Sequence, residues 1–219
     1  MNVSLISYTP AAAALCGSAA GTCYNAKSPV RALNSAMQGG HYSVLEHASF
    51  TFEISDVSRV LLAQLTRHRL ASFSVQSQRY CGANNQCVLP QEVIDHGYDR
   101  QFAMMWNAAF DLYKEMITAG IPEEDARYII PQGVTCKLVM TMNARELRHF
   151  FELRTCNRAQ WEIRDLADAM LRECKKVAPS LFEGAGCGCV NGHCPEGRRS
   201  CGKPRHESEW ENSDVPCED

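Results

Sequence analysis

The sequence lacks any long run of apolar residues. A helix that crosses a bilayer needs about 20 consecutive residues that are mostly apolar, and no stretch of the 219 residues approaches that length. The N-terminus also lacks the basic segment of a secretory signal peptide, and Pro10 interrupts its short apolar run. We therefore expect a soluble protein that has no membrane partner.

A strong excess of charge is also missing. Lys and Arg total 22 and Asp and Glu total 25, which gives a formal net charge of −3 at pH 7. Residues 187–219 carry seven of the acidic and four of the basic residues, so residues 1–186 balance at 18 of each sign. No broad basic surface for nucleic acid is therefore expected, and an anion site needs positive charge that is gathered locally.

Regular cysteine spacing is absent from most of the chain. Seven of the 12 cysteines are scattered through segments that read as core elements, and five lie beyond residue 186. A secreted disulfide framework would be denser and more regular, so a reducing cytoplasm is the expected compartment. A hydrophobic fraction of 45% and a charged fraction of 21% are typical of a globular chain and suit one domain.

The glycine-rich phosphate-binding motifs, G-x-G-x-x-G after a strand and the P-loop with its lysine, are absent as well. The sequence has instead the stretch Arg67 to Tyr80, with three arginines, a histidine, three serines, two glutamines and a tyrosine. Each guanidinium offers a planar fork of donors that matches phosphate or carboxylate oxygens. This composition favours a site for an anionic ligand such as a nucleotide, and the alternative is a solvated helix end followed by a polar loop.

Hydrophobic periodicity and capping residues predict an α+β fold, with a small mixed or antiparallel sheet backed by several long helices in a single domain. Strands are expected near the N-terminus and over 48–55 and 134–142. Helices are expected over 30–38, from Ser43, after Ser55-Asp56, over 91–119, from Pro122, over 143–156 and over 160–178. The expected buried side of the 91–119 helix consists of Phe102, Met105, Trp106, Ala109, Phe110 and Tyr113.

One arginine interrupts an apolar pattern in the expected 143–156 helix. Leu147, Phe150, Phe151 and Arg154 fall at i, i+3, i+4 and i+7, so the arginine continues the apolar stripe. An unpaired buried charge is costly. The Arg154 side chain must therefore extend to solvent or find an acidic partner or a ligand.

An ordered series of motifs resembles the flavin-dependent thymidylate synthase family. Arg67-His68-Arg69, seven further residues and Ser77 resemble the family signature, and Gln78-Arg79-Tyr80 extends it. The series spans about residues 1–183. Its other parts are Gly40-His41 through Glu46-His47, Phe50-Thr51-Phe52, Ala126-Arg127, Pro131, Asn143-Ala144-Arg145, Phe150, Leu153-Arg154, Ala159-Gln160-Trp161-Glu162-Ile163 and Pro179.

The resemblance implies a homotetramer with shared active sites that methylates dUMP to dTMP. Methylenetetrahydrofolate would donate the carbon, and FAD reduced by NADPH would supply the hydride. The implied flavin contacts are Ser43, Arg67, His68, Arg69, Asn143, Arg145 and His149. The implied deoxyuridylate contacts are Gln64, Arg67, Val75, Gln76, Ser77, Gln78, Arg79, Arg127 and Arg154.

Two of these residues have implied catalytic roles. Arg154 would lie against the uracil ring, where a fixed cation favours the N3-deprotonated base and makes C5 more nucleophilic. His68 is a candidate general base, and a structural hydrogen bond to the flavin or the phosphate is the alternative. Ser77 is assigned to binding, because no adjacent base is evident that would activate it.

The chain departs from the family pattern at two places. Ser74-Val75 stands where most relatives carry Asn-Glu, so two side-chain contacts of the loop are missing or replaced. Arg158 stands where the family often has histidine. Neither change removes an arginine that the implied mechanism needs.

The segment 184–219 differs in character from the expected catalytic domain, residues 1–183. Its cysteines lack the paired C-x2-C spacing, so no metal site is firm, and a flexible Cys-rich extension is the alternative to zinc binding. Residues 206–219 are acidic and expected to be disordered. The candidate zinc ligands are Cys187, Cys189, Cys194 and Cys201, with His193 and His206 nearby.

Two other classes of function remain open. The first is a non-enzymatic zinc or RNA-binding module, which would need basic charge beyond the 67–80 stretch. The second is a nucleotide phosphohydrolase that uses the Arg-His-Arg cluster, which would need a nucleophile or metal carboxylates. Neither explains the downstream motifs.

Overall fold

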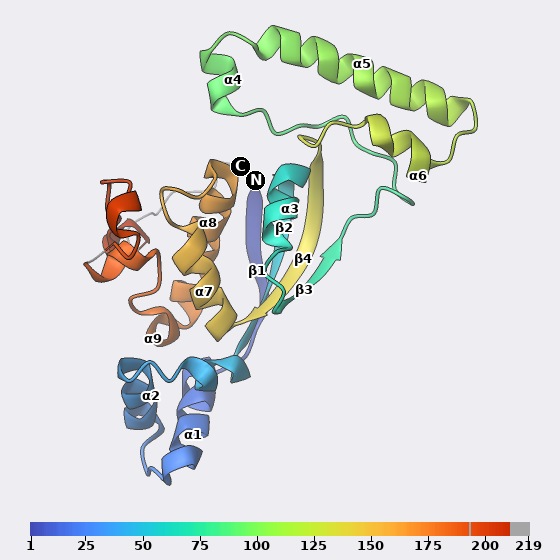
Figure 1. The fold of residues 1–219 in the computed structure, drawn as a ribbon. Helices are drawn as coiled ribbons and strands as arrows, with labels where there is room; N and C mark the ends of the chain where they lie inside the picture. The colour runs from blue at the N-terminus through green and yellow to red at the C-terminus, as the bar shows by residue number, and fades with distance from the viewer. Residues whose placement is uncertain (193, 211–219) are drawn as a thin grey trace. The chain divides into compact units, whose positions relative to one another are not determined.

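The chain divides into two compact units in a computed structural model, which describes residues 1–192 and 194–210. The first unit contains residues 1–2, 54–67 and 74–138, and the second contains residues 3–53, 68–73 and 139–219. Figure 1 shows the elements of both. Among the described residues, no helix combines the length and the hydropathy needed to cross a membrane.

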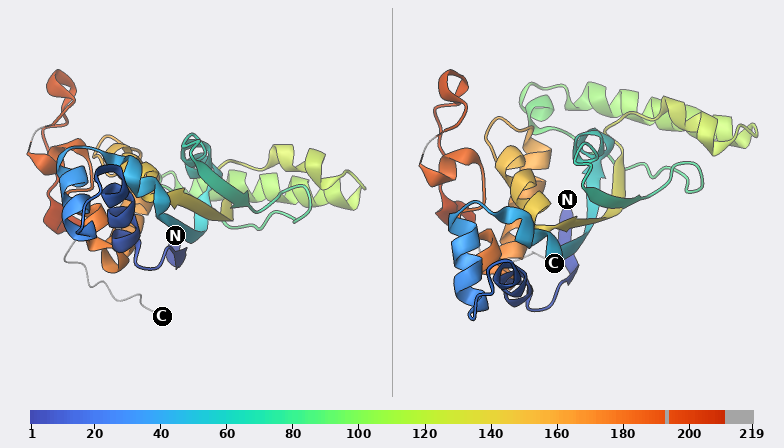
Figure 2. Two further views of the ribbon diagram at one scale, coloured as in Figure 1. Left: turned by 90° about the horizontal axis from the view of Figure 1, so that it is seen from below. Right: turned by 60° about the horizontal axis from the view of Figure 1, so that its bottom comes forward.

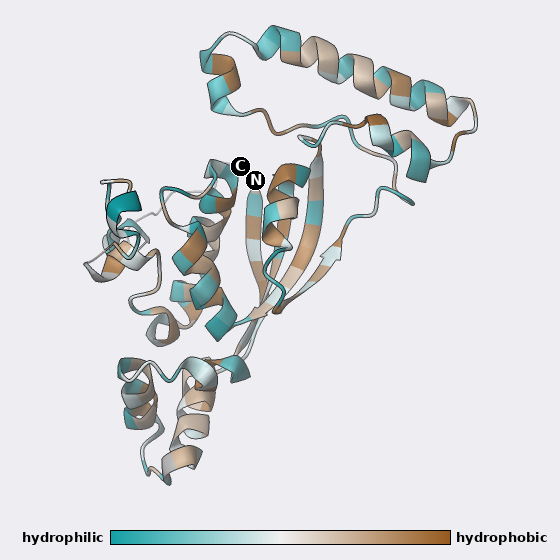
Figure 3. Cartoon of the chain, in the orientation of Figure 1, coloured by the Kyte–Doolittle hydropathy of each residue, from teal (hydrophilic) through white to brown (hydrophobic). Residues whose placement is uncertain are grey.

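Four strands form one antiparallel sheet in the order β1-β2-β4-β3. The expected α+β class and the small antiparallel sheet are confirmed. Hydrophobic residues recur along β4 (Figure 3). The Oγ1 atoms of Thr51 and Thr141 lie 2.9 Å apart across the neighbours β2 and β4. The strands are β1 (Asn2–Tyr8), β2 (Ser49–Ser58), β3 (Ala71–Val75) and β4 (Thr135–Asn143).

In the second unit, the helices α1 and α2 lie side by side in every view (Figure 2). The Ser28 side chain caps α2, as its position before Pro29 predicts. The helix expected from Ser43 is a 3-10 helix that begins at Tyr42 and has no side-chain cap. The elements are α1 (Ala12–Tyr24), α2 (Pro29–Gln38), η1 (Tyr42–His47), α7 (Ala144–Arg154), α8 (Trp161–Val177) and α9 (Pro179–Phe182).

An aromatic cluster fills the core of this unit. The Phe182 ring packs edge-on against Phe50 and Phe151, with ring centroids 5.3 and 5.9 Å apart. Phe150 packs against Phe151 with centroids 5.7 Å apart. All four side chains are fully buried, so the apolar stripe of α7 is fixed against α9 and β2.

In the first unit, the expected 91–119 helix is interrupted. Gly97 has φ 73°, a left-handed conformation that glycine adopts without strain, and it separates α4 from α5. Trp106, Phe110 and Tyr113 are buried as expected, whereas Met105 is 72% exposed. The elements are α3 (Arg59–Leu65), α4 (Gln91–Asp95), α5 (Asp99–Thr118), α6 (Glu123–Ala126) and η2 (Arg127–Ile129).

Two further local expectations need correction. The α3 helix begins later than Ser55-Asp56 suggests, because Ser58 accepts from the Leu61 N–H and Asp56 has φ 57°. The stretch after Arg69 is not all loop, since residues 71–75 form β3. The sequence did not predict this strand, because the residues of one face are serines and those of the other face are only half-buried.

The tail is ordered further than its acidity predicts. Residues 188–191, 197–199 and 207–210 form 3-10 turns, η3 (Gly188–Asn191), η4 (Gly197–Arg199) and η5 (Glu207–Trp210). Trp210 is 3% exposed. Disorder is therefore the wrong expectation for residues 206–210, and residues 211–219 lie outside the described part of the chain.

Candidate functional site

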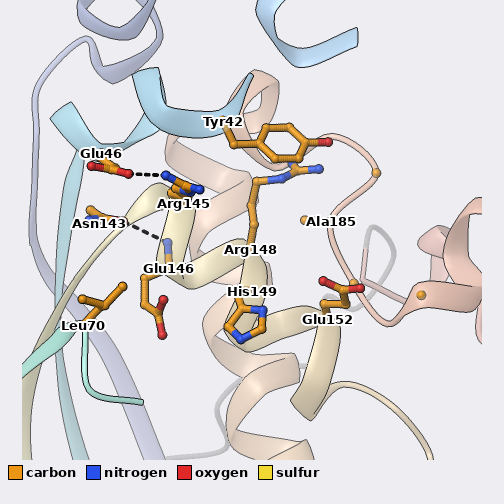
Figure 4. Close-up of a pocket in the computed structure, with 13 residues that line it drawn as sticks. Tyr42, Glu46, Leu70, Asn143, Arg145, Glu146, Arg148, His149, Glu152 and Ala185 are labelled. Atoms are coloured by element: carbon orange, nitrogen blue, oxygen red, sulfur yellow. Dashed lines mark hydrogen bonds and ion pairs between the residues drawn. The ribbon is translucent and has the colours of Figure 1, made fainter. Parts of the chain in front are cut away.

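A cavity of about 700 Å³ opens in the second unit beside α7 (Figure 4). Three of the expected flavin contacts, Asn143, Arg145 and His149, line it. Glycines of the tail also contribute to its wall. The remaining lining residues are Tyr42, Glu46, Leu70, Glu146, Arg148, Glu152, Gly184, Ala185, Gly186 and Gly188.

The sequence of α7 explains how its polar side chains reach the cavity. Asn143 caps the helix by accepting from the Glu146 N–H at 2.9 Å, a role that suits an asparagine directly before a helix. Four polar residues follow at i, i+3, i+4 and i+7, the spacing of one helix face. They are Arg145, Arg148, His149 and Glu152, and this face lies opposite the buried Leu147, Phe150 and Phe151.

Both arginines of this helix face already have partners. Arg145 Nη1 donates to Glu46 Oε1, which fixes the guanidinium beside η1. Arg148 Nη1 donates to the carbonyls of Leu181 and Glu183 at 2.9 and 3.0 Å, and its guanidinium lies 5.1 Å from the centre of the Tyr42 ring. Arg148 is thus a structural link, and Arg145 is more exposed and faces the cavity with a single carboxylate partner.

His68 is the buried member of the Arg-His-Arg triplet, with 5% exposure. Its Nε2 accepts a hydrogen bond from Arg154 Nε at 3.1 Å, and its Nδ1 lies 3.4 Å from Glu146 Oε1. Burial, and then the nearby charges of Arg154 and His149, lower the pKa of His68 to about 4. At neutral pH the ring is therefore uncharged, with its proton on Nδ1 directed at Glu146.

Of the three partners that the sequence allowed for Arg154, solvent, an acid or a ligand, the acid is not found among the described residues. Its guanidinium is half-buried and pairs with a neutral imidazole, and burial lowers its pKa. The hydrogen bond uses Nε, and within the described residues no hydrogen bond from its two terminal nitrogens is found. A cation with an oriented stem and open donors suits a ligand that carries developing negative charge.

The other members of the triplet differ from His68. Arg67 and Arg69 are exposed, and Gln64 is half-buried in the last turn of α3. Ser43 is exposed in η1. Gln64 and Arg67 belong to the first unit, whereas His68, Arg69 and Ser43 belong to the second.

A second set of expected site residues meets in the first unit around Glu124. Arg79 Nε donates to Glu124 Oε2 at 2.9 Å, and Arg127 Nε donates to the Glu124 carbonyl at 3.0 Å. Two arginines that are 48 positions apart in the sequence thus contact the same residue, one at its carboxylate and the other at its main-chain carbonyl. About half of the side-chain surface of Arg79 and of Glu124 is exposed, so solvent screens this ion pair.

The loop that carries Arg79 is fixed by backbone contacts. The Gln76 N–H donates to the Lys137 carbonyl at 2.9 Å, and Arg59 Nη2 donates to the Gln76 carbonyl at 2.9 Å. Ser77 Oγ accepts from the Arg79 N–H at 3.1 Å, which is a structural use of that hydroxyl. Val75 and Gln78 are half-buried at the two sides of this turn.

Sequence reasoning did not identify three partners, Glu146, Glu124 and Arg59. Each forms its contact with a residue remote in the chain, so no local spacing marks it. Glu146 carries one weak signal, since an acidic residue in the first turn of a helix suits the helix dipole. That signal does not indicate that the Glu146 carboxylate turns towards His68.

The candidate zinc ligands do not gather into a metal site in residues 1–192 and 194–210, where no group of three or more His, Cys, Asp or Glu side chains has suitable geometry. Cys187 and Cys189 have their Sγ atoms 3.3 Å apart. Burial raises the pKa of Cys187 to about 12, which opposes the thiolate form that binds metal. His193 lies outside the described residues.

Comparison with known proteins agrees with the expected family. The model of the family described as thymidylate synthase complementing protein matches residues 4–180. A flavin-dependent thymidylate synthase of Geobacter sulfurreducens is 46% identical, over 93% of this chain and 94% of that protein. The flavin-dependent thymidylate synthase of Clostridium tetani is 43% identical, also over 93% of this chain and 94% of that protein.

Solved structures show the same relationship. The flavin-dependent thymidylate synthase ThyX of Helicobacter pylori, complexed with FAD and dUMP, superposes with a TM-score of 0.70 at 27% identity, over 85% of this chain and all of that one. The UMP/dUMP methylase PolB of Streptomyces cacaoi, bound with 5-Br dUMP, gives 0.72 at 25% identity, over 83% of this chain and 93% of that one. Because the family model matches residues 4–180, which is most of this chain, the chain belongs to the flavin-dependent thymidylate synthases.

Proposed function

We propose that this protein methylates dUMP to dTMP, with methylenetetrahydrofolate as the carbon donor and FAD reduced by NADPH as the hydride source. The observation that carries the proposal is the cavity beside α7, in which three expected flavin contacts converge in a chain of this family. No specific observation favours the RNA-binding or phosphohydrolase alternatives.

The residues of this cavity fit a flavin. A volume of about 700 Å³ is within the usual range for cofactor pockets. Because Asn143 uses its side-chain oxygen as the helix cap, its amide N–H₂ remains a donor, and Arg145 and His149 add polar groups at the same wall. Bound FAD, once reduced, would supply the hydride that completes the methyl group. Ser43, Arg67, His68 and Arg69 complete the proposed set of contacts.

The proposed phosphate site contains Arg79 and Arg127. Their contacts with the same residue, Glu124, support a common anion site, since each guanidinium would offer a pair of donors to phosphate oxygens. The turn fixed by Arg59 would hold the sugar or base through backbone groups, which makes the loss of the usual Asn-Glu side chains at Ser74-Val75 tolerable. The other proposed substrate contacts are Gln64, Arg67, Val75, Gln76, Ser77, Gln78 and Arg154.

Arg154 would stabilise the N3-deprotonated uracil and so raise the nucleophilicity of C5. Its stem is oriented by neutral His68, which Glu146 in turn orients. With a pKa of about 4, His68 is a weak base at neutral pH, so we assign it an orienting role and not that of general base.

We further propose that the protein works as a homotetramer in a reducing cytoplasm, with each site built from more than one subunit. An apolar groove on the first unit supports self-association. Met104 and Met105 are 64% and 72% exposed on α5, and Tyr98 is 61% exposed beside them. Met105→Glu is expected to shift the protein to smaller species in analytical ultracentrifugation.

The direct test follows dTMP formation by the purified protein with dUMP, methylenetetrahydrofolate, NADPH and FAD, each omitted in turn. The purified protein is expected to be yellow from a bound flavin, and, once that flavin has been removed, to form dTMP only when all four are present. Formation of dTMP without FAD, or failure to take up FAD, would contradict the proposal.

A further inference from the structure

The C-terminal tail folds back onto the helices that carry the cavity. Glu207 Oε1 accepts from the Gly184 N–H at 2.9 Å and forms an ion pair with Lys175 of α8. Asn157 and Arg158, which follow α7, donate to the carbonyls of Lys203 and Arg199 at 2.8 and 2.7 Å. The tail is thus attached at several points, and its beginning forms part of the cavity wall.

Arg205 is the centre of this attachment, with a side chain that is 11% exposed. Its Nη1 donates to both carboxylate oxygens of Asp168 on α8, at 3.0 and 2.9 Å. Its Nε donates to Glu209 at 2.8 Å, and its guanidinium lies 4.7 Å from the centre of the Trp210 ring. Trp210 Nε1 donates to the same Asp168 at 2.8 Å, so two tail residues converge on one buried carboxylate.

The same Nη1 also donates to the Thr155 carbonyl at 2.8 Å. Thr155 is the C-cap of α7 and follows Arg154 directly. Carbonyls in the last turn of a helix lack intrahelical partners, and a cation there is favourable for both hydrogen bonding and the helix dipole. Arg205 therefore fixes the end of α7 to α8 at the carbonyl of Thr155, the residue that follows Arg154.

We propose that Arg205 is a positioning residue that holds Arg154 in its substrate-binding orientation. Two restraints act on Arg154 from opposite ends. His68 accepts from its side chain, and Arg205 restrains the main chain at the carbonyl of the next residue, Thr155. The proposal rests on the function proposed above, since it gives the tail a part in binding dUMP.

The charge and shape of Arg205 are both required. A lysine keeps the charge, but it lacks the planar fork that holds Glu209 through Nε while Nη1 holds Asp168 and the Thr155 carbonyl. Trp210→Phe keeps an aromatic ring beside Arg205 and removes the donor to Asp168. These two milder changes keep the test valid even where Arg205→Ala destabilises the fold.

The test measures dUMP binding to the full-length holoenzyme by titration calorimetry. Arg205→Lys is expected to raise the dissociation constant for dUMP about tenfold, and Trp210→Phe about threefold, with the flavin absorbance and FAD content unchanged. Arg198→Ala, an exposed arginine of the same tail, is the matched control and is expected to bind dUMP as the wild type does.

A double-mutant cycle with Arg154→Lys separates positioning from a purely structural role. If Arg205 acts through Arg154, Arg205→Lys has little further effect on the dissociation constant once Arg154 is replaced. Independent effects that multiply would overturn the proposal, as would wild-type dUMP binding by Arg205→Lys in a protein that makes dTMP. A wild-type protein that makes no dTMP would instead contradict the proposed function itself.

Discussion

The two arginine groups of this chain differ in how far water reaches them. Arg79 pairs with Glu124 at a surface where about half of each side chain is exposed. Arg154 pairs with His68, which is 5% exposed and has its pKa lowered to about 4. The partner of Arg79 is a charged carboxylate, whereas the partner of Arg154 is a neutral imidazole ring.

This difference indicates a division of roles. An exposed ion pair is worth little, so an incoming phosphate can replace Glu124 as the partner of Arg79 at small cost. The half-buried Arg154 guanidinium cannot exchange partners so freely, because it pairs with the buried His68 ring and the desolvation of the pair must be compensated in every state. We therefore expect the exposed group to govern phosphate affinity and the buried group to govern the chemistry at the pyrimidine ring.

The largest effect is expected for Arg154→Ala. Removing a preorganised charge at the position where negative charge develops typically lowers kcat by about a hundredfold to a thousandfold. FAD is expected to remain bound, because the proposed flavin contacts Asn143, Arg145 and His149 are unchanged. Steady-state dTMP formation and the flavin spectrum measure the two quantities separately, and retained turnover would show that Arg154 is misassigned.

The next effect concerns pH and stability. The pKa of His68 is about 4 in the folded protein against its ordinary 6.5, so the unfolded chain takes up the proton first as pH falls. The free energy of unfolding should therefore decrease from pH 6.5 towards pH 4. At pH 5 the loss that is due to His68 should be about 2 kcal/mol relative to neutral pH. Urea unfolding measures the free energy of unfolding at pH 8 and at pH 5. The difference between these two values is expected to be smaller in His68→Gln than in the wild type, because the variant lacks the His68 contribution.

The opposite result would be informative about the buried group. A wild type and a His68→Gln variant with the same pH dependence would mean that His68 titrates normally. In that case Arg154 would face a protonated ring at low pH, and the comparison between a neutral buried partner and a charged exposed one would fail. His47→Gln, at an exposed histidine of the same unit, serves as the control.

The sequence predicted those elements whose signals are local. Asn143 before an apolar stripe predicted α7 with its cap, and Ser28-Pro29 predicted α2. It did not predict β3, because that strand depends on β4, to which the adjoining Gln76 donates. It also missed the break at Gly97, since a single glycine in a helical pattern is compatible with either outcome.

The site follows the same rule. Residue types and their order were sufficient to identify His68 and Arg154 as site candidates. Their hydrogen bond was not predictable, because it joins residues 86 positions apart. The role of Arg205 was hidden for the same reason, since its partners Asp168 and Thr155 lie 37 and 50 positions away.

The smallest effect is expected at the exposed group, for Glu124→Gln. The neutral amide removes the carboxylate that competes with a phosphate dianion for Arg79, and an exposed pair of this kind is worth at most about 1 kcal/mol, or about fivefold in affinity. The dissociation constant for dUMP should therefore fall by up to about that factor, and the gain should shrink as salt screens the charges.

Asp125→Asn makes the same change of charge at the neighbouring exposed position and should have a smaller effect, because the ion pair with Arg79 is formed by Glu124. Calorimetric titration with dUMP at low and high ionic strength measures both variants. If Glu124→Gln weakens dUMP binding instead, then Glu124 holds Arg79 in its binding orientation. The exposed group would then be preorganised like the buried one, and solvent exposure would no longer separate their roles.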